Sequence, residues 1–328
     1  MRVCVTGASG FIGREVVKQL HMKGYDTIAM VRDEQRASML KAYADLFTLD
    51  LEDVDDNTFK KVIGNCDAVI HLAARVRFHP YSMLKAVMVD STEKIARVCK
   101  EHATRLIYAS SIAVYGNGNG SSLDEDSICK PDTGYGRAKL EAETIIMDMI
   151  KEGFDAIILR PGYVYGYSDH GSDPIARMLI TGRVFWIGSA TNYTGVVHVH
   201  DCARAFVESL SYNGNVRIFN VVDDEPVRWL DYLNYACSLL SIGKPVLLPY
   251  TLANTLSYII NGIAVVLNKA SDLSPDLMRA IRYSARYSNS RLKQCMNFNL
   301  VYPTYRDGLR QVVDEITSNS KQHKISYI

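Results

Sequence analysis

The first 160 residues alternate short apolar runs with helix-length amphipathic stretches, and this alternation restricts the chain to few folds. Strand patterns cover residues 2–6, 26–31, 46–49, 67–73, 105–110 and 155–160, and helical patterns cover 11–24, 34–44, 56–64, 82–103 and 133–153. The expected strands lack a polar face, which is typical of a parallel sheet covered by helices on both sides. The sequence therefore predicts an α/β fold. After Gly166 the pattern loosens into mixed helices and short strands.

The segment TGASGFIG, residues 6–13, joins the first expected strand to the first expected helix. In this setting Gly7 permits a tight turn, and Gly10 removes a side chain where a pyrophosphate approaches. Gly13 lets the helix pack closely on the strand, and the first free N–H groups of the helix point at the anion. We therefore interpret the segment as a dinucleotide site and not as a plain glycine turn.

The end of the second expected strand bears on the choice between NAD and NADP. A carboxylate there binds the ribose hydroxyls of NAD, and a basic residue meets the 2'-phosphate of NADP. The sequence reads AMVRDEQR, with Arg32 directly after the apolar run and Asp33 behind it. We favour NADP(H), while Asp33 keeps NAD(H) possible and Arg32 has the alternative of a solvated charge. Asp50 and Leu51 follow the third strand, at an expected adenine edge, and helix capping is the alternative for Asp50.

Candidate catalytic residues follow the fifth expected strand and open the last helix of the first half. YASSIAVYG ends that strand with Ser111, and TGYGRAK places Tyr135 and Lys139 four residues apart, on one helix face. A phenol has an ordinary pKa near ~10, and an ammonium at this spacing together with an oxidised nicotinamide favours its anion. Tyr135 would exchange the proton of a substrate hydroxyl, and Ser111 would orient the same oxygen. A solvated helix pair is the alternative for Tyr135 and Lys139.

Charge and cysteine usage exclude other classes of function. The chain has 37 basic and 36 acidic residues, so it lacks the basic excess that binding to a nucleic-acid backbone needs. Its seven cysteines are scattered, with no CxxC pair and no spacing suited to a metal site. We expect reduced thiols in the cytoplasm, no metal and no nucleic-acid partner.

Taken together, these residues resemble the extended short-chain dehydrogenases/reductases, or NAD-dependent epimerase/dehydratase family, over nearly the whole chain. The matching motifs are TGxxGxxG at 6–13, HxAA at 71–74, the strand end SSIAVYG at 110–116, YxxxK at Tyr135 and Lys139, RPxxxYG at 160–166 and HVxDxAxA at 198–205.

The resemblance implies a Rossmann-type doubly wound parallel sheet over residues 1–165 and a smaller, mainly substrate-binding lobe over 166–328, packed against it. It also implies a Ser-Tyr-Lys catalytic set of Ser111, Tyr135 and Lys139. Expected cofactor contacts are Gly7, Ser9, Gly10, Phe11, Ile12, Gly13, Arg32, Asp50, Leu51, Leu72, Ala73, Ala74, Tyr135, Lys139 and Pro161.

Departures from the family pattern reduce the number of reactions that fit this chain. Where the family has NVxGT, this chain has MVDST, and Met88 puts in doubt a relay or helix bend built on the asparagine. Sugar-nucleotide dehydratases of the resembled family carry an acidic pair directly after the active-site Ser/Thr. This chain has Ile112 and Ala113 at those positions, which disfavours dehydratase activity. UDP-hexose epimerases usually carry a diphosphate-clamping arginine just before HVxD, where this chain reads NYTG, residues 192–195. That stretch is more similar to 3β-hydroxysteroid dehydrogenases and dihydroflavonol reductases, whose substrates are apolar.

We therefore predict an NAD(P)-dependent oxidoreductase that transfers hydride between the nicotinamide and a secondary alcohol or ketone carbon. A nucleotide-sugar 4-epimerase with tightly bound NAD is the alternative, and a non-catalytic NADP-binding module is a further one. Candidate substrate contacts are Arg75, Tyr163, Arg183 and Asn192, and for the arginines a surface charge is the alternative. We expect His198 and His200 to alternate on a strand in structural roles, with Asp201 capping the next helix.

Two parts of the sequence indicate what the protein could associate with, a membrane surface or a second copy of the chain. Residues 245–268 contain no charged residue, and Asn254, Ser257 and Asn261 form a polar stripe on the helix expected after Pro249. We favour a buried or lid-forming helix and keep peripheral membrane contact through 249–268 as the alternative. The helical patterns at 82–103 and 136–150 predict a homodimer through a four-helix contact, as is common in the resembled family.

Overall fold

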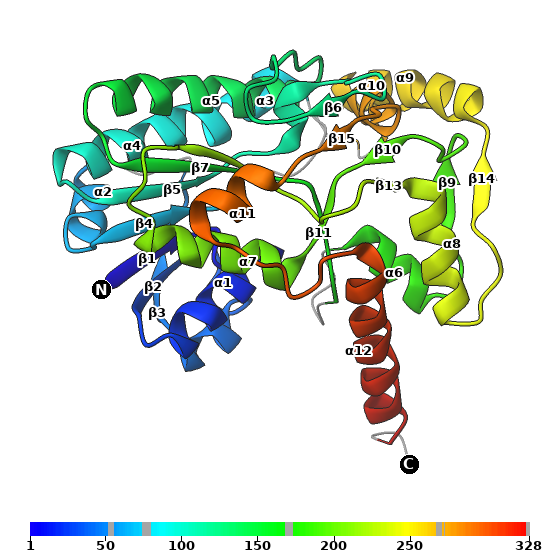
Figure 1. Ribbon diagram of the computed structural model, residues 1–328, viewed down its shortest axis with the longest axis horizontal. Helices are drawn as coiled ribbons and strands as arrows, with labels where there is room; N and C mark the ends of the chain where they lie inside the picture. Colours follow the sequence, from blue (N-terminus) through cyan, green and yellow to red (C-terminus); the bar gives the residue numbers. More distant parts are fainter. Residues whose placement is uncertain (52–55, 74–79, 168–172, 267–270, 272, 326–328) are drawn as a thin grey trace.

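The computed structural model describes residues 1–51, 56–73, 80–167, 173–266, 271 and 273–325 (Figure 1). Its centre is a seven-stranded sheet in which every neighbouring pair is parallel. The strand order is β12 (Ile218–Val221), β7 (Ala156–Pro161), β5 (Arg105–Ala109), β4 (Ala68–His71), β1 (Arg2–Thr6), β2 (Asp26–Val31) and β3 (Asp45–Thr48).

Helices cover both faces of the sheet because both faces of its strands are apolar. On β1, Val3 and Val5 pack toward one face while Cys4 packs toward the other. The first face is covered by α1 (Phe11–Met22), α7 (Val199–Glu208) and α11 (Ser290–Met296); the second is covered by α2 (Asp56–Ile63), α4 (Ser91–Glu101) and α5 (Gly134–Lys151) (Figure 1). The predicted doubly wound α/β fold is confirmed.

The strand order reverses between β1 and β4. From β1 the chain builds outward to β2 and β3, and from β4 it builds in the opposite direction. Thr6 at the end of β1 therefore lies in register with His71 at the end of β4. In doubly wound sheets, ligands bind at such a switch point, beyond the carboxyl ends of the strands.

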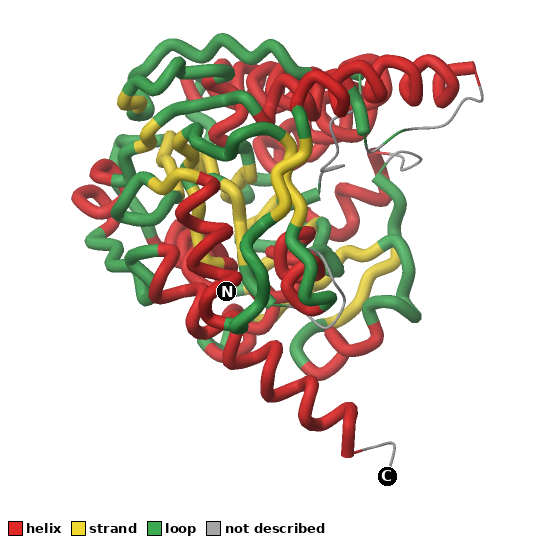
Figure 2. Tube along the Cα trace, turned by 90° about the vertical axis from the view of Figure 1, so that its right-hand side faces the viewer, coloured by secondary structure: helices red, strands yellow, loops and turns green. Residues whose placement is uncertain are grey.

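The second half of the chain forms a smaller lobe with its own core around Tyr165, Tyr232 and Leu233. Its helices are α6 (Pro174–Ile180), α8 (Trp229–Leu239), α9 (Tyr250–Val266), α10 (Pro275–Ile281) and α12 (Tyr305–Ile325), and α12 projects from the body toward the C terminus (Figure 2). Its paired strands are β8 (Tyr163–Tyr165) with β11 (Val196–His198), β9 (Phe185–Ile187) with β14 (Val246–Leu248), β10 (Tyr193–Thr194) with β13 (Val227–Arg228), and β15 (Arg286–Tyr287) with β6 (Ser122–Leu123) from the first half.

The predicted division at residue 165 describes the chain only in part. Strand β12 returns to pair with β7, and α7 packs against α1 on the Rossmann sheet. The Rossmann layers are thus completed by residues that follow the expected boundary. Substrate binding by the remaining lobe stays a prediction.

One predicted helix is shorter in the structure, and another contains a π-helical turn. Only a 3-10 turn, η1 (Ser38–Ala42), forms within 34–44. The stretch 82–103 divides into α3 (Tyr81–Lys85), a π-helical turn η2 (Ala86–Asp90) and α4. The hydroxyls of Ser91 and Thr92 donate to the carbonyls of Val87 and Met88. The helix is therefore distorted here, with Met88 at the position where the resembled family has asparagine.

Candidate active site

The glycine turn forms an open cradle at the switch point. Gly7 has φ +69°, and a Cβ there would lie 2.8 Å from the Ala73 nitrogen after β4. A Cβ on Gly13 would lie 2.2 Å from the Gly7 carbonyl oxygen, so α1 approaches β1 at backbone distance. The N-cap Gly10 brings no side chain to the start of α1, and the first turn holds no acidic residue. These features fit the pyrophosphate of a dinucleotide.

A buried hydrogen-bonded chain supports the two strand ends beneath this cradle. His71 Nδ1 lies 2.6 Å from Thr6 Oγ1, and His71 Nε2 lies 3.0 Å from Thr92 Oγ1 on α4. Burial, together with the positive charge of Lys139, lowers the pKa of His71 to about 3. The imidazole is therefore neutral at physiological pH and joins β1, β4 and α4 as a structural bridge.

Arg32 and Asp33 follow β2, and the structure gives them different surroundings. Asp33 Oδ1 accepts the backbone N–H groups of Gln35 (3.0 Å) and Arg36 (3.1 Å), and its other oxygen pairs with Arg36 at 3.3 Å. Arg32 is exposed. Asp50 is exposed as well, whereas Leu51 packs on the core beneath the sheet.

Ser111 and Tyr135 lie together at the carboxyl end of β5. Ser111 caps the 3-10 turn η3 (Ile112–Tyr115), where its oxygen accepts the Ala113 N–H at 3.2 Å. Tyr135 lies in the first turn of α5 and forms a hydrogen bond with Ser111. A Cβ on Gly136 would lie 2.6 Å from the Ala113 oxygen, so glycine at this position lets α5 reach the Ser111 turn.

Lys139 is buried one turn after Tyr135. Its Nζ donates to the Ala109 carbonyl oxygen at 2.5 Å and lies 4.8 Å from the centre of the Tyr108 ring. Burial lowers the pKa of Lys139 to about 7, and the carboxylate of Glu143 opposes this shift. The side chain is thus fixed beneath the start of α5.

The pKa of the Tyr135 phenol reflects its burial. In the protein without a dinucleotide, burial raises this pKa to about 12, and the hydrogen bond with Ser111 only partly opposes the rise. The expectation that Lys139 and an oxidised nicotinamide together favour the phenolate stays a prediction. In the protein alone, Tyr135 is a protonated phenol at neutral pH.

The sequence analysis did not predict the buried ion pair between Arg160 and Glu143. Arg160, at the end of β7, donates from Nε and Nη2 to Glu143 at 2.9 and 2.6 Å, and both side chains are at most 4% exposed. Arg160 Nη1 also donates to the hydroxyl of Tyr115, which in turn donates to Asn220 on β12. The sequence signals were the spacing of Glu143, one turn after Lys139 on the same face, and the position of Arg160 in the RPxxxYG motif.

The start of α5 is held from two sides. Thr133 caps the helix by accepting the Gly136 N–H at 3.2 Å. Asp276, in the first turn of α10, accepts the Gly134 N–H at 2.6 Å. The residue directly before Tyr135 is therefore fixed by a carboxylate from the second lobe, which no sequence pattern indicated.

The described substrate candidates make other contacts. The hydroxyl of Tyr163 donates to Asp173, the N-cap of α6, and Asn192 donates to the carbonyls of Ile281 (3.1 Å) and Tyr283 (2.7 Å). Arg183 is exposed. Ala74 and Arg75 lie outside the described residues. The roles of these residues in binding stay predictions.

The prediction that Asp201 caps α7 was wrong. His198 is the N-cap, because its Nδ1 accepts the His200 N–H at 3.3 Å, and His200 lies in the helix and not on the strand. Asp201 instead accepts the N–H groups of Val301 (2.9 Å) and Tyr302 (2.8 Å). Its buried carboxylate attaches the C-terminal segment to the Rossmann layers.

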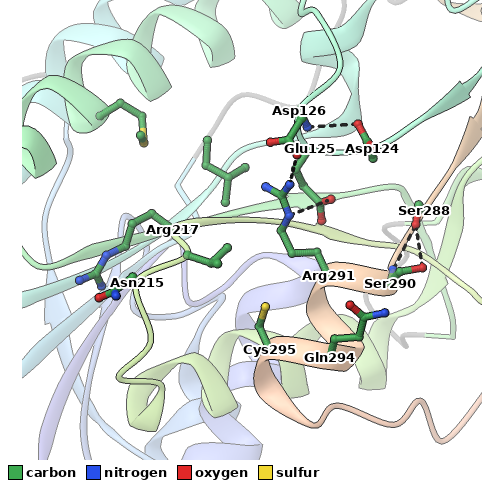
Figure 3. Close-up of a pocket in the computed structure, with 13 residues that line it drawn as sticks. Asp124, Glu125, Asp126, Asn215, Arg217, Ser288, Ser290, Arg291, Gln294 and Cys295 are labelled. Atoms are coloured by element: carbon green, nitrogen blue, oxygen red, sulfur yellow. Dashed lines mark hydrogen bonds and ion pairs between the residues drawn. The ribbon is translucent and has the colours of Figure 1, made fainter.

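A cleft of about 630 Å³ lies elsewhere, beside edge strand β12 (Figure 3). Within it, Arg291 pairs with Asp126 and reaches Glu125 at 3.6 Å. Its lining contains none of the predicted catalytic, cofactor or substrate residues. The lining residues are Asp124, Glu125, Asp126, Met147, Asn215, Val216, Arg217, Ile218, Ser288, Ser290, Arg291, Gln294 and Cys295.

Comparison with known proteins agrees with this geometry. The family model of the NAD dependent epimerase/dehydratase family matches residues 3–221, which include the glycine cradle, Ser111, Tyr135 and Lys139. The chain belongs to the NAD-dependent epimerase/dehydratase family. It is therefore an enzyme of a family that works with a nicotinamide dinucleotide and that includes dehydrogenases, reductases and epimerases.

Two curated relatives and one solved structure illustrate the breadth of the epimerase/dehydratase family. Sterol-4-alpha-carboxylate 3-dehydrogenase (decarboxylating) of Dictyostelium discoideum is 26% identical over 69% of this chain and 73% of its own length. The 4-hydroxy-2-methyl-3-oxo-4-farnesyl-3,4-dihydroquinoline-1-oxide ketoreductase of Stigmatella aurantiaca is 26% identical over 71% of each chain. The UDP-glucose 4-epimerase of Thermotoga maritima, solved with UDP-glucose, shares the fold with a TM-score of 0.78 at 18% identity, over 97% of this chain and 99% of that one.

Proposed function

We propose that this enzyme interconverts a secondary alcohol and its ketone, with Tyr135 as the general acid/base. The observation that carries the proposal is the meeting of the Ser111 hydroxyl with the Tyr135 phenol, beside a cradle that fits a dinucleotide. A nucleotide-sugar 4-epimerase remains the second candidate, favoured by the solved UDP-sugar epimerases with this fold. A non-catalytic NADP-binding module is the third.

Each residue of the set has a chemical role in this proposal. When bound, the nicotinamide supplies or accepts the hydride at the substrate carbon. In the reducing direction Tyr135 gives its proton to the substrate oxygen, and in the oxidising direction it takes that proton back. Ser111 donates a hydrogen bond to the same oxygen and orients it. Lys139 adds a positive charge beneath the site when protonated, and a charge of that sign favours the phenolate.

We propose an apolar substrate in preference to a sugar nucleotide. Two relatives carry sterol and farnesyl names. Where UDP-hexose epimerases usually carry an arginine just before HVxD, this chain has Asn192 and Thr194, and Asn192 donates to two backbone carbonyls. Within this proposal Tyr163, Arg183 and Arg75 are the remaining candidates for substrate contact.

Mass spectrometry of the denatured protein and a screen of apolar ketones test the reaction together. Reversible dinucleotide binding with ketone-dependent oxidation of the reduced nucleotide is the expected result. Tightly retained NAD, with turnover of a UDP-sugar and none of any ketone, would instead support the epimerase.

For the cofactor we propose NADP(H), with Arg32 contacting the 2'-phosphate. Replacing Arg32 by Ala is expected to weaken NADPH binding by about 10- to 100-fold, since a hydrogen bond to a charged group contributes roughly 1.5–3 kcal/mol. NADH binding should change little. Arg36→Ala is the matched control, because Arg36 is an exposed arginine in the same loop after β2 but pairs with Asp33. Equal losses for both nucleotides in fluorescence titration would contradict the assignment and favour NAD(H) through Asp33.

We also propose a cytoplasmic homodimer that associates through α4 and α5. All seven cysteines are free thiols, which suits a reducing compartment. On α5, Leu140, Ile145 and Met149 keep partial exposure, as a helical contact between copies requires. A monomer by light scattering would exclude the dimer. Peripheral membrane contact through 249–268 is the remaining proposed partner.

A further inference from the structure

Helix α9 presents its large apolar side chains outward. The residues that it buries are small: Ala253, Ser257 and Ala264 are at most 9% exposed. Its large apolar residues are 38–59% exposed, namely Leu252, Leu256, Tyr258, Ile259, Ile260 and Ile263. The prediction of a buried helix is therefore wrong for this face, and the lid-forming helix stays a prediction. The predicted polar stripe lies toward the protein, because Asn254 and Asn261 are half-buried beside the fully buried Ser257.

Strand β14 and its neighbour β9 also expose large apolar side chains. Strand β14 directly precedes α9, and its Val246, Leu247 and Leu248 are 42–51% exposed. Phe185 of the neighbouring β9 is 44% exposed and lies in register with Val246. Helix α9 and strand β14 follow one another at the right of Figure 1. Val246 and Leu248 share one side of β14, and Leu247 points to the other. We call the exposed apolar residues of α9, together with Phe185, Val246 and Leu248, the apolar face. An exposed apolar patch of this kind marks an interaction site on a soluble domain.

Three cationic side chains lie next to the apolar face. Lys244 is the only charged residue between 244 and 264, and it is exposed. Arg183 is also exposed and precedes Val184, whose carbonyl accepts the Val246 N–H at 2.8 Å, so both cations lie at one end of the β9–β14 pair. Arg282 lies over the ring of Tyr250, 5.3 Å from its centre. An anionic surface would meet an apolar face with a cationic rim.

A second copy of the chain fits this face less well than a lipid surface. The segments β9, β14 and α9 contain no acidic residue, so a second copy paired through the same face would offer the cations no carboxylate from these segments, whereas anionic headgroups neutralise them. Tyr250 and Tyr258 are also suited to the headgroup level of a bilayer. Within the part of the chain that the structure describes, no helix has both the length and the apolar character that a bilayer crossing requires.

The apolar face is linked to the candidate active site by α10. Tyr250, at the start of α9, donates its hydroxyl to the Met278 carbonyl at 3.3 Å. On the same short helix, Asp276 accepts the Gly134 N–H, directly before Tyr135. Helix α10 therefore contacts both the start of α9 and the residue directly before Tyr135, the proposed acid/base.

We infer that the apolar face docks in the plane of an anionic bilayer, with α9 lying along the interface and Arg183, Lys244 and Arg282 at the headgroups. Docking would give the candidate site direct access to apolar alcohols or ketones dissolved in the bilayer. That last step rests on the proposed function, whereas the docking itself does not.

Flotation with vesicles tests the docking on the full-length protein without substrate. We expect flotation with phosphatidylcholine vesicles that contain phosphatidylserine, and weaker flotation with phosphatidylcholine alone. Replacing Ile259 and Ile263 together by Ser should weaken binding by at least tenfold. Ile128→Ser, at a residue 74% exposed elsewhere on the surface, is the matched control and should bind as the unchanged protein does. Arg183→Glu with Lys244→Glu should abolish the preference for phosphatidylserine.

Two results would overturn the inference. One is no flotation with either vesicle. The other is a dimer that the Ile259 and Ile263 double variant dissociates in light scattering, without any vesicle binding, which would assign the face to a second copy. Activity toward a water-soluble ketone separates this inference from the proposed function. Ketone reduction without flotation would leave the function standing and remove the docking, and flotation without any dinucleotide-dependent activity would do the reverse.

Discussion

Replacing Tyr135 by Phe is expected to lower turnover by about 10³-fold, because the substrate oxygen then has no side-chain proton donor or acceptor. Dinucleotide affinity should stay within about threefold, since the glycine cradle is untouched and the lost hydroxyl is a single hydrogen-bonding group. The pKa of Tyr135, about 12 in the protein alone, makes the phenol an acid at neutral pH. Ketone reduction at neutral pH, followed by nucleotide absorbance, is therefore the assay in which the loss should be largest.

Tyr81→Phe provides a matched control for this experiment. Tyr81 packs on the same cluster as Tyr135, around Leu84 and Met88, but its hydroxyl donates to Glu141. Removing the Tyr81 hydroxyl should leave turnover within about twofold of that of the unchanged protein, because its hydrogen bond to Glu141 is partly exposed. If Tyr135→Phe retained more than a tenth of the activity, the acid/base would have to be another group.

Replacing Glu143 by Gln is expected to lower the free energy of unfolding by about 3–5 kcal/mol. The substitution leaves the Arg160 guanidinium buried without its carboxylate, and an unpaired buried charge is costly. It also removes the charge that opposes the lowered pKa of Lys139, so that pKa should fall further below about 7. Urea unfolding of the purified variant measures the change in stability.

Glu152→Gln serves as the reference for Glu143→Gln. Glu152 pairs with Lys100 on the surface, where its side chain is 69% exposed, so its loss should cost at most about 1 kcal/mol. Combining Glu143→Leu with Arg160→Met should recover much of the lost stability, because no unpaired charge remains. A Glu143→Gln variant as stable as Glu152→Gln would show that water reaches Arg160.

The sequence was sufficient to predict the central sheet and the position of the glycine turn. Strand β2 was predicted at the residues where it forms, because apolar β-branched runs bounded by turn residues leave little choice. The helix over 34–44 was wrong in extent. Asp33 accepts backbone N–H groups there and favours a turn, a local competition that hydrophobic periodicity does not register.

The contacts that define the candidate site were harder to predict because they join residues distant in the chain. Gly134 meets Asp276, and Asn192 meets Tyr283, through hydrogen bonds that no spacing rule encodes. The orientation of α9 was unpredictable for another reason. Periodicity shows that Asn254, Ser257 and Asn261 share a face, but only the packing decides which face is covered.

The position of β12 has a consequence for how the protein is made. Strands β1 to β7 are complete once residue 161 has been synthesised, but the outer neighbour of β7 is supplied by residues 218–221. Until those residues leave the ribosome, β7 is an unpaired edge, which is the kind of strand on which nascent chains aggregate. Chaperone protection during translation is therefore most valuable over the intervening sixty or so residues.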